Sequence, residues 1–249
     1  MKAMKNHPIH RFVLRRIESL SVFILLALVT SCVSNPRVEE SSPAQREIEE
    51  RSLAERWARD IEAILQTRED VVIQGYVASV SARLGLLVRP RVTLFSGGTA
   101  SRLSPVFALP GHHWYFSTRA LKFLRYDNEL AAAIAAAHAL SERMQQSRTL
   151  SSPVPSLGGG TLSLPTYSDE EWRQVNARMV ELLYQAGFDP RGVPQFWKKA
   201  ASAWIGMPPD WAIFLQEEAH ALISQRTPLV NPVVRTPEFG EIEKRLKKL

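Results

Sequence analysis

Apolar residues recur three or four positions apart through much of the chain, a spacing that places them on one face of a helix. In the segment 46–67 this apolar face is Ile48, Leu53, Trp57, Ile61, Ile64 and Leu65. The same spacing, or a high helix propensity, predicts further helices at 71–87, 129–146, 167–186, 190–204 and 209–224. Helices therefore account for most of the expected structure.

Short apolar runs rich in β-branched and aromatic residues predict a small sheet. The run 91–95 predicts one strand, and 104–117 predicts two strands joined by a turn at Pro110-Gly111. The aromatic residues at 114–116 are expected to alternate between core and surface. The fold class that follows is a mainly helical α+β domain with a small sheet or hairpin, interrupted by a Ser/Pro/Gly-rich loop at 147–166.

The formal charge of +6 does not indicate nucleic-acid binding. Five of the 31 Lys/Arg and one of the 25 Asp/Glu lie in residues 1–31, so the remaining chain is nearly balanced. Those first residues combine a basic start with the apolar run "LSVFILLALV", which is too short to span a bilayer comfortably. The pattern is typical of an export signal.

The segment Val29-Thr30-Ser31-Cys32 resembles the bacterial lipobox. The resemblance implies cleavage before Cys32 and attachment of acyl chains, which would anchor the protein to a membrane without a spanning helix. Because Cys32 is the only cysteine, no intrachain disulfide is possible. Val33 stands where inner-membrane lipoproteins commonly carry Asp, so we expect anchoring at the periplasmic face of the outer membrane.

Four segments in order resemble the HtpX/BepA-like zinc metallopeptidases of bacterial envelopes, which carry a His-Glu-x-x-His helix. They are "YVASVSARLG", "FALPGHHWYFSTRAL", "DNELAAAIAAAH" and "YSDEEWRQVNARMVELLYQAGFDPRG". In the family the second segment contains Phe-Ala-Leu-Pro-Gly-Gly. The resemblance implies a zincin-like domain whose hairpin packs on the helix that binds zinc in the family.

The same alignment implies that the zinc chemistry is lost. The two histidines of the family fall on Ala136 and Leu140, and the glutamate base falls on Ala137. Counted back from "AGFDP", the third ligand falls on Gln174 and a nearby Asp on Asn176. Ala and Leu have no donor atoms and a neutral Gln is a poor zinc ligand, so we expect a neutral core and no cofactor.

An alternative is a zinc endopeptidase with a relocated site. His138 and Glu142 are four residues apart and share a helical face, with His112 or His113 as further ligands from the hairpin. Otherwise His138 is a surface or satisfied histidine, Glu142 is a solvated neighbour of Arg143, and the chain is not an enzyme.

The domain organisation that follows is a signal peptide (1–31), a lipidated cysteine with a polar tether (32–45), a pseudopeptidase domain (46–222) and an irregular tail ending in a basic helix (223–249). Its expected partners are the membrane, through Cys32, and envelope proteins or extended peptides, with no nucleic acid. The expected role is peptide binding or a scaffold function, in outer-membrane protein quality control or assembly.

In the family, the strand before the Pro-Gly turn holds extended peptide by adding a strand to the sheet. Here that edge strand is Pro105, Val106, Phe107, Ala108 and Leu109. The apolar groove beside it would be lined by Ala133, Ala136, Ala137 and Leu140, unless the groove has collapsed into the core.

Replacing Cys32 by Ser should abolish acylation, because only the thiol can carry the thioether-linked lipid. Metabolic labelling with a palmitate analogue, followed by membrane fractionation, checks this. Label retained in the Cys32→Ser variant would contradict the lipobox assignment.

Overall fold

The computed structural model describes residues 42–97, 103–146, 167–204 and 208–249. These residues form a mainly helical α+β domain with a small four-stranded mixed sheet. Both hydrophobic clusters of the core lie within one compact unit, Ala44–Leu249, which is therefore the part expected to fold by itself. The predicted signal peptide, most of the tether and the loop 147–166 lie outside the described residues.

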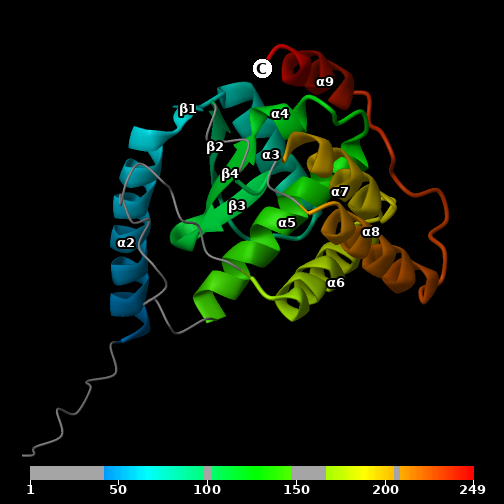
Figure 1. The fold of residues 1–249 in the computed structure, drawn as a ribbon, viewed down its shortest axis with the longest axis horizontal. Helices are drawn as coiled ribbons and strands as arrows, with labels where there is room; N and C mark the ends of the chain where they lie inside the picture. The colour runs from blue at the N-terminus through cyan, green and yellow to red at the C-terminus, as the bar shows by residue number, and fades with distance from the viewer. Residues whose placement is uncertain (1–41, 98–102, 147–166, 205–207) are drawn as a thin grey trace, which may run out of the picture. The chain divides into compact units, whose positions relative to one another are not determined.

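Figure 1 shows the order of the elements along the chain. They are α2 (Pro43–Ile64), β1 (Gln66–Arg68), α3 (Val71–Arg83), β2 (Arg91–Ser96), β3 (Val106–Leu109), the short 3-10 helix η2 (Pro110–His112), β4 (His113–Ser117), α4 (Thr118–Leu121), α5 (Asp127–Gln146), α6 (Asp169–Gln185), α7 (Gly192–Ala203), α8 (Pro209–Ser224) and α9 (Phe239–Lys247). None of the described helices is long and apolar enough to cross a membrane.

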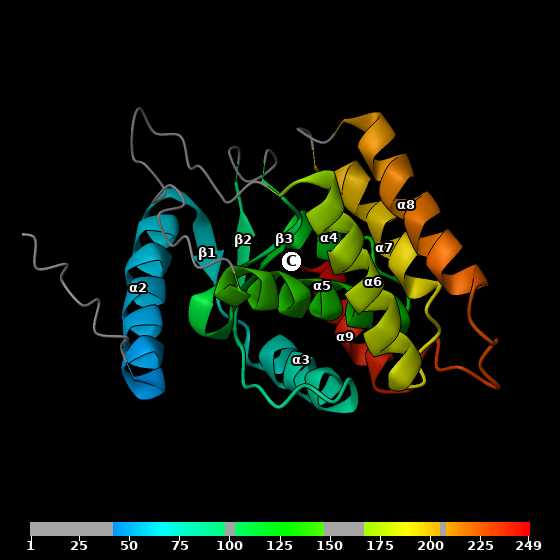
Figure 2. The same cartoon turned by 90° about the horizontal axis from the view of Figure 1, so that it is seen from below.

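The sheet has the order β1-β2-β4-β3 and is covered on both faces. Alternate residues of β2, β3 and β4 enter different hydrophobic clusters: in β4, Trp114 and Phe116 pack with α5, whereas Tyr115 packs with α2. Figure 2 shows α2 on one side of the sheet and α5 to α8 on the other. The prediction that residues 114–116 alternate between core and surface is wrong, because α2 covers the second face and leaves Tyr115 1% exposed.

The prediction that residues 66 and 67 belong to the preceding helix is wrong, because α2 ends at Ile64 and Gln66–Arg68 form the strand β1. Gln66, Thr67 and Arg68 pair antiparallel with β2, from Ser96 back to Leu94. A three-residue strand is too short to show a period of its own, so only the pairing defines it.

The tail 223–249 packs against the rest of the domain. Phe239 and Leu246 of α9 are fully buried, and Val233 forms an isolated parallel bridge with Phe188. Thr236 donates to the buried carboxylate of Asp127, which also accepts from Tyr76 at 2.8 Å between the oxygens. These contacts join the tail to the start of α5 and to α3.

The start and the end of α6 follow from local backbone chemistry. Ser168 and Glu171 form a reciprocal capping box at the start of α6, which satisfies two otherwise unpaired N–H groups. Gly187, at φ 72°, ends the same helix, because glycine adopts this left-handed conformation without a side-chain clash.

Gly192 marks a close approach between α7 and α5. A Cβ atom placed on Gly192 would lie 2.3 Å from the carbonyl oxygen of Asn128, which is backbone and cannot move aside locally. We therefore expect Gly192→Ala to lower the free energy of unfolding by about 3 kcal/mol, in urea denaturation.

Gly75 is the matched control. It lies inside α3, and a Cβ atom placed on it would meet no atom within 4 Å beyond its chain neighbours and the backbone of its own helix, so Gly75→Ala should stabilise the protein by about 0.5–1 kcal/mol. Equal effects of the two substitutions would contradict the close packing of α7 on α5.

Candidate functional site

The centre of α5 is the position to which the sequence assigns the former metal site. Ala136, Ala137 and Leu140 are all fully buried, and α5 packs against β3, α6 and α7. None of these three side chains carries a donor atom for a metal or for a proton transfer. This part of α5 belongs to the hydrophobic core.

Asn176, on the facing helix α6, is fully buried and hydrogen-bonded through both ends of its amide. Its Oδ1 accepts from Trp197 Nε1 at 2.7 Å, and its Nδ2 donates to the carbonyl oxygen of Leu215 at 2.9 Å. The amide thereby joins α6 to α7 and α8. A carboxylate could accept from Trp197 but could not donate to Leu215, so the site requires a neutral amide.

Gln174 does not lie in the neutral core, and that prediction is wrong. The residue is exposed, its Oε1 accepts from Arg143 and its Nε2 donates to Glu170. Residues two apart on a helix point in directions that differ by about 200°, so burying Asn176 turns Gln174 to the surface.

His138 and Glu142 are brought together as the helical spacing predicts. His138 Nε2 lies 3.1 Å from Glu142 Oε1, and the ring packs edge-on against Trp114. Burial lowers the pKa of His138 below its ordinary value, with a further lowering by Arg178 and an opposing effect of Glu142. The ring donates a hydrogen bond from its Nε2–H group to the Glu142 carboxylate.

Glu142 is only partly exposed, and its ionic partner lies on another helix, not at Arg143. Arg178 of α6 holds both oxygens of Glu142, with N–O distances of 3.1 and 3.2 Å. A guanidinium at this distance repels a metal cation and occupies the lone pairs that a metal would need. The pairing was invisible in the sequence because 36 residues separate the partners.

A third metal ligand is not grouped with these two. Among the residues that the structure describes, no three His, Cys, Asp or Glu side chains are grouped so as to hold a metal ion. His112 and His113 lie on the hairpin turn, and burial is the main cause that lowers the pKa of His113. His220 is exposed on α8, as its helical pattern predicts.

The edge strand predicted at 105–109 is found at the end of the sheet. It starts one residue later than expected, at Val106, because Pro105 has no N–H and precedes the strand. The Pro105 carbonyl still accepts from the Ser117 amide, at 2.9 Å. Since antiparallel partners alternate, the amides and carbonyls of Val106 and Ala108 point away from β4.

Part of this outer edge is already occupied. The Val106 carbonyl accepts from Ser104 Oγ at 2.6 Å. Within the described residues, neither Val106 nor Ala108 has a backbone partner beyond β4. The Val106 amide and both main-chain groups of Ala108 point to this outer side, although the two residues are at most 2% exposed.

The predicted groove floor beside β3 is not open. Ala133, Ala136, Ala137 and Leu140 all have no exposed surface, and they share one hydrophobic cluster with Val106 and Ala108 of the strand. The alternative weighed in the sequence, a groove that has closed into the core, fits this burial. Because the alanine side chains are small, α5 and β3 pack in direct contact and leave no groove between them.

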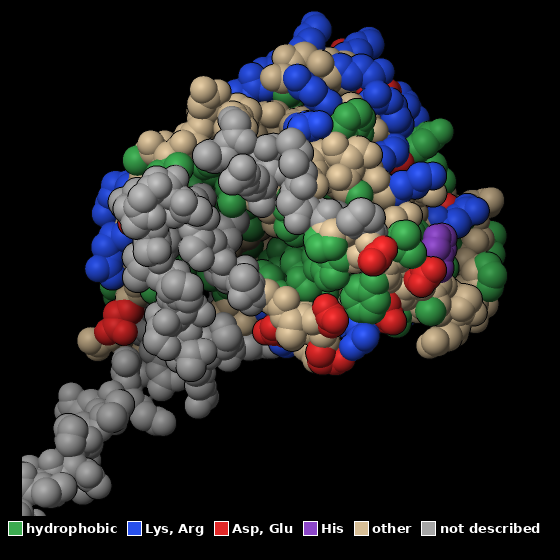
Figure 3. Space-filling model, in the orientation of Figure 1, with side chains coloured by type: hydrophobic (Ala, Val, Ile, Leu, Met, Phe, Trp, Pro, Cys, Tyr) green, Lys and Arg blue, Asp and Glu red, His purple; other side chains and the backbone are tan. Residues whose placement is uncertain are grey.

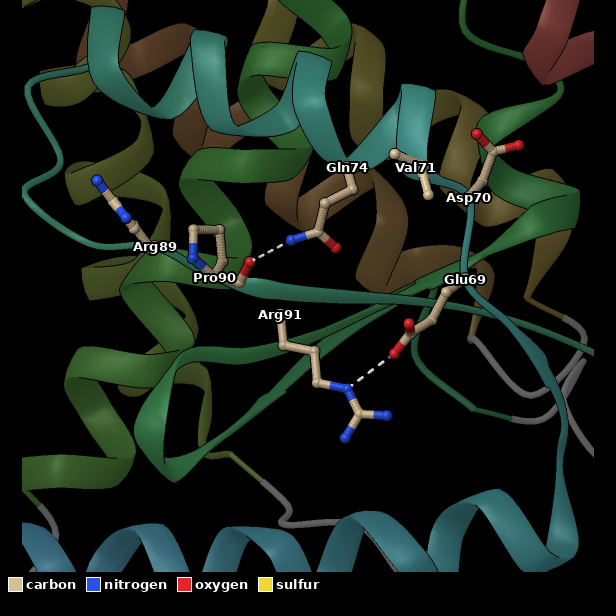
Figure 4. A pocket seen from close by; sticks show the side chains of 7 residues that line it. All are labelled: Glu69, Asp70, Val71, Gln74, Arg89, Pro90 and Arg91. Carbon is tan, nitrogen blue, oxygen red and sulfur yellow. Dashed lines mark hydrogen bonds and ion pairs between the residues drawn. The ribbon is translucent and has the colours of Figure 1, made fainter.

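A cavity of about 460 Å³ lies elsewhere, between the start of α3 and the start of β2 (Figure 4). The side-chain amide of Gln74 lies beside the start of β2, where it donates to the Pro90 carbonyl and accepts from the Val92 amide. It thereby makes the two hydrogen bonds that a neighbouring strand would otherwise make. Arg91 is paired with Glu69, at 2.9 Å. None of the residues selected from the sequence lines this cavity, and its charges are largely satisfied internally.

Neither the models of known protein families nor the curated proteins contain a match to this chain.

Restoring a carboxylate at position 176 tests the role of the buried amide. Asn176→Asp should lower the stability by about 3 kcal/mol at neutral pH, because the charge is desolvated and the donor to Leu215 is lost. Burial raises the folded-state pKa of such a carboxyl above its unfolded value of about 3.9. The variant should therefore regain stability in acid and lose it as the pH rises through that folded-state pKa, in urea denaturation at several pH values.

The matched control is Gln174→Glu, which adds the same charge two residues away. This position is exposed and faces Arg143, so the stability should change by less than about 0.5 kcal/mol. A large loss at 174 together with a small one at 176 would contradict the burial described above.

Proposed function

We propose that this chain is a lipid-anchored, non-catalytic envelope protein built on the fold of a zinc metallopeptidase. Its role is to bind extended segments of other proteins at the outer edge of β3. Quality control or assembly of outer-membrane proteins is the process in which such a role fits best.

The loss of zinc chemistry rests on one observation, the full burial of Ala136, Ala137 and Leu140. A hydrolytic zinc site needs protein ligands, an open position for water and a base beside it. The present residues do not fit the metal, since they provide neither donors nor space. The relocated alternative at His138 and Glu142 is weakened by Arg178, whose guanidinium already binds both oxygens of Glu142.

The resemblance to the peptidase family gains support from the backbone of the hairpin turn. Gly111 and His112 both have positive φ, 69° and 61°, in the left-handed region that glycine favours. The family has two glycines at these positions. A histidine at such a φ fits a turn whose geometry was retained while its second glycine was substituted.

Peptide binding is supported by the main-chain groups of β3 that point away from β4. Because Val106 and Ala108 are at most 2% exposed, a peptide could reach these groups only if the chain around them moved aside. A peptide strand adding there would find the Val106 amide and the Ala108 amide and carbonyl directed toward it. The binding would rely on main-chain hydrogen bonds and would therefore tolerate many sequences. It requires no metal and no open groove floor.

Fluorescent casein, an unfolded polypeptide, tests binding and cleavage in one assay. The wild-type domain should bind casein without producing fragments, and Ala108→Pro should weaken binding about tenfold, because it removes a donor and fills the edge. The β3–β4 ladder keeps its bonds in this variant, since the Ala108 amide points away from β4.

Ser104→Ala is the opposing control. It removes the hydroxyl that occupies the Val106 carbonyl, so casein should bind more tightly. Casein fragments that disappear on adding a chelator would overturn the non-catalytic assignment. Binding that neither substitution changes would place the interaction away from β3 and favour a scaffold role through another face.

A further inference from the structure

Basic side chains gather where α4 and α9 pack together. Figure 3 shows Lys and Arg concentrated over the region in which Figure 1 places these two helices. We name this surface the basic ridge and define it as Arg119, Lys122, Arg125, Arg235, Lys247 and Lys248.

Hydrogen bonds and ion pairs connect four members of the ridge, Lys122, Arg125, Arg235 and Lys247, across the sequence. Arg235 donates to the Arg125 carbonyl at 2.8 Å, and Arg125 donates to the Lys122 carbonyl at 2.7 Å. Arg235 and Lys247 share the carboxylate of Glu243, at 2.7 and 2.6 Å. Segments more than a hundred residues apart are thereby held as one surface.

The positive charge of the ridge is only partly neutralised. Glu243 is 8% exposed, and the hydrogen bonds from Lys247 and Arg235 lower its pKa to about 2, so it remains ionised beneath the two cations. Arg119 and Lys122 are exposed and have no acidic partner among the residues that the structure describes. The ridge therefore presents an excess of positive charge to any approaching surface.

Two aromatic side chains project from the same turn. Phe123 is 40% exposed and Tyr126 is 46% exposed, directly beside Lys122 and Arg125. Lys199 lies 5.7 Å from the centre of the Tyr126 ring, which keeps this ring next to positive charge. Aromatic rings among lysines and arginines are typical of protein surfaces at the membrane–water interface.

We infer that the basic ridge, with Phe123 and Tyr126, docks the domain onto a bilayer surface that bears anionic phospholipids. The ridge is broad and extends over α4, α9 and the segment between α8 and α9. A surface of that breadth can contact many lipid headgroups at once, and the exposed rings of Phe123 and Tyr126 can insert partly into the bilayer.

The choice of a bilayer rests on the proposed envelope location, since an anchor at Cys32 would bring a membrane within reach of the domain. The ridge would then supply the second of the two signals that stable membrane association generally needs. A docked domain would be held in one orientation, which a lipid tether alone cannot impose.

The test uses the compact domain without its anchor, residues 33–249, and vesicles of phosphatidylcholine with or without phosphatidylglycerol. The domain should sediment with the anionic vesicles only, and added salt should release it. Arg119→Gln/Lys122→Gln should weaken binding about tenfold, because each charge near an anionic surface contributes up to about fivefold.

Arg56→Gln/Arg59→Gln is the matched control, which removes the same charge from the exposed side of α2. It should bind as the wild type does, and thermal unfolding should show that both variants are folded. Phe123→Ser should weaken the part of the binding that persists in salt.

Three results would overturn the inference: no binding to anionic vesicles, equal losses in the ridge and α2 variants, or displacement by a DNA oligonucleotide at lower concentration than by vesicles. Because the protein used lacks Cys32, failure here leaves the lipid anchor untouched. A failed acylation experiment would equally leave vesicle binding by the ridge measurable in this assay.

Discussion

The fold depends on a helix that is almost entirely alanine and leucine at its centre. Seven alanines lie between residues 131 and 139, and all are at most 2% exposed. Side chains this small let the hairpin β3–β4, α6 and α7 approach α5 closely, and the contact of Gly192 with the Asn128 carbonyl continues the same packing. Close packing stabilises by dispersion contacts and by removing apolar surface from water.

That packing also determines what the site can do. A metal ion with a bound water needs space lined by polar atoms. Around Ala136, Ala137 and Leu140 the space is filled by apolar side chains. The polar residues that remain nearby are engaged with one another: Asn176 with Trp197, and Glu142 with His138 and Arg178. The two proposed binding surfaces therefore rest on the main chain of β3 and on charges away from α5.

The sequence predicts local features well where one short segment determines them. The helical spacing of α2 and α6, the Pro110-Gly111 turn and the glycine that ends α6 are of this kind. It predicts poorly what depends on distant partners. Tyr115 is buried because α2 covers it, and Glu142 is paired because α6 brings Arg178 beside it. The exposure of Gln174 follows from the burial of Asn176, which no spacing rule selects.

Zinc content tests the central claim most directly. The domain from residue 33 onward would be exposed to zinc, desalted and measured by inductively coupled plasma mass spectrometry. The account predicts no retained zinc, in the wild type and in His138→Ala alike. Near-stoichiometric zinc that is lost in His138→Ala would contradict it, and would make a relocated site at His138 and Glu142 the leading explanation.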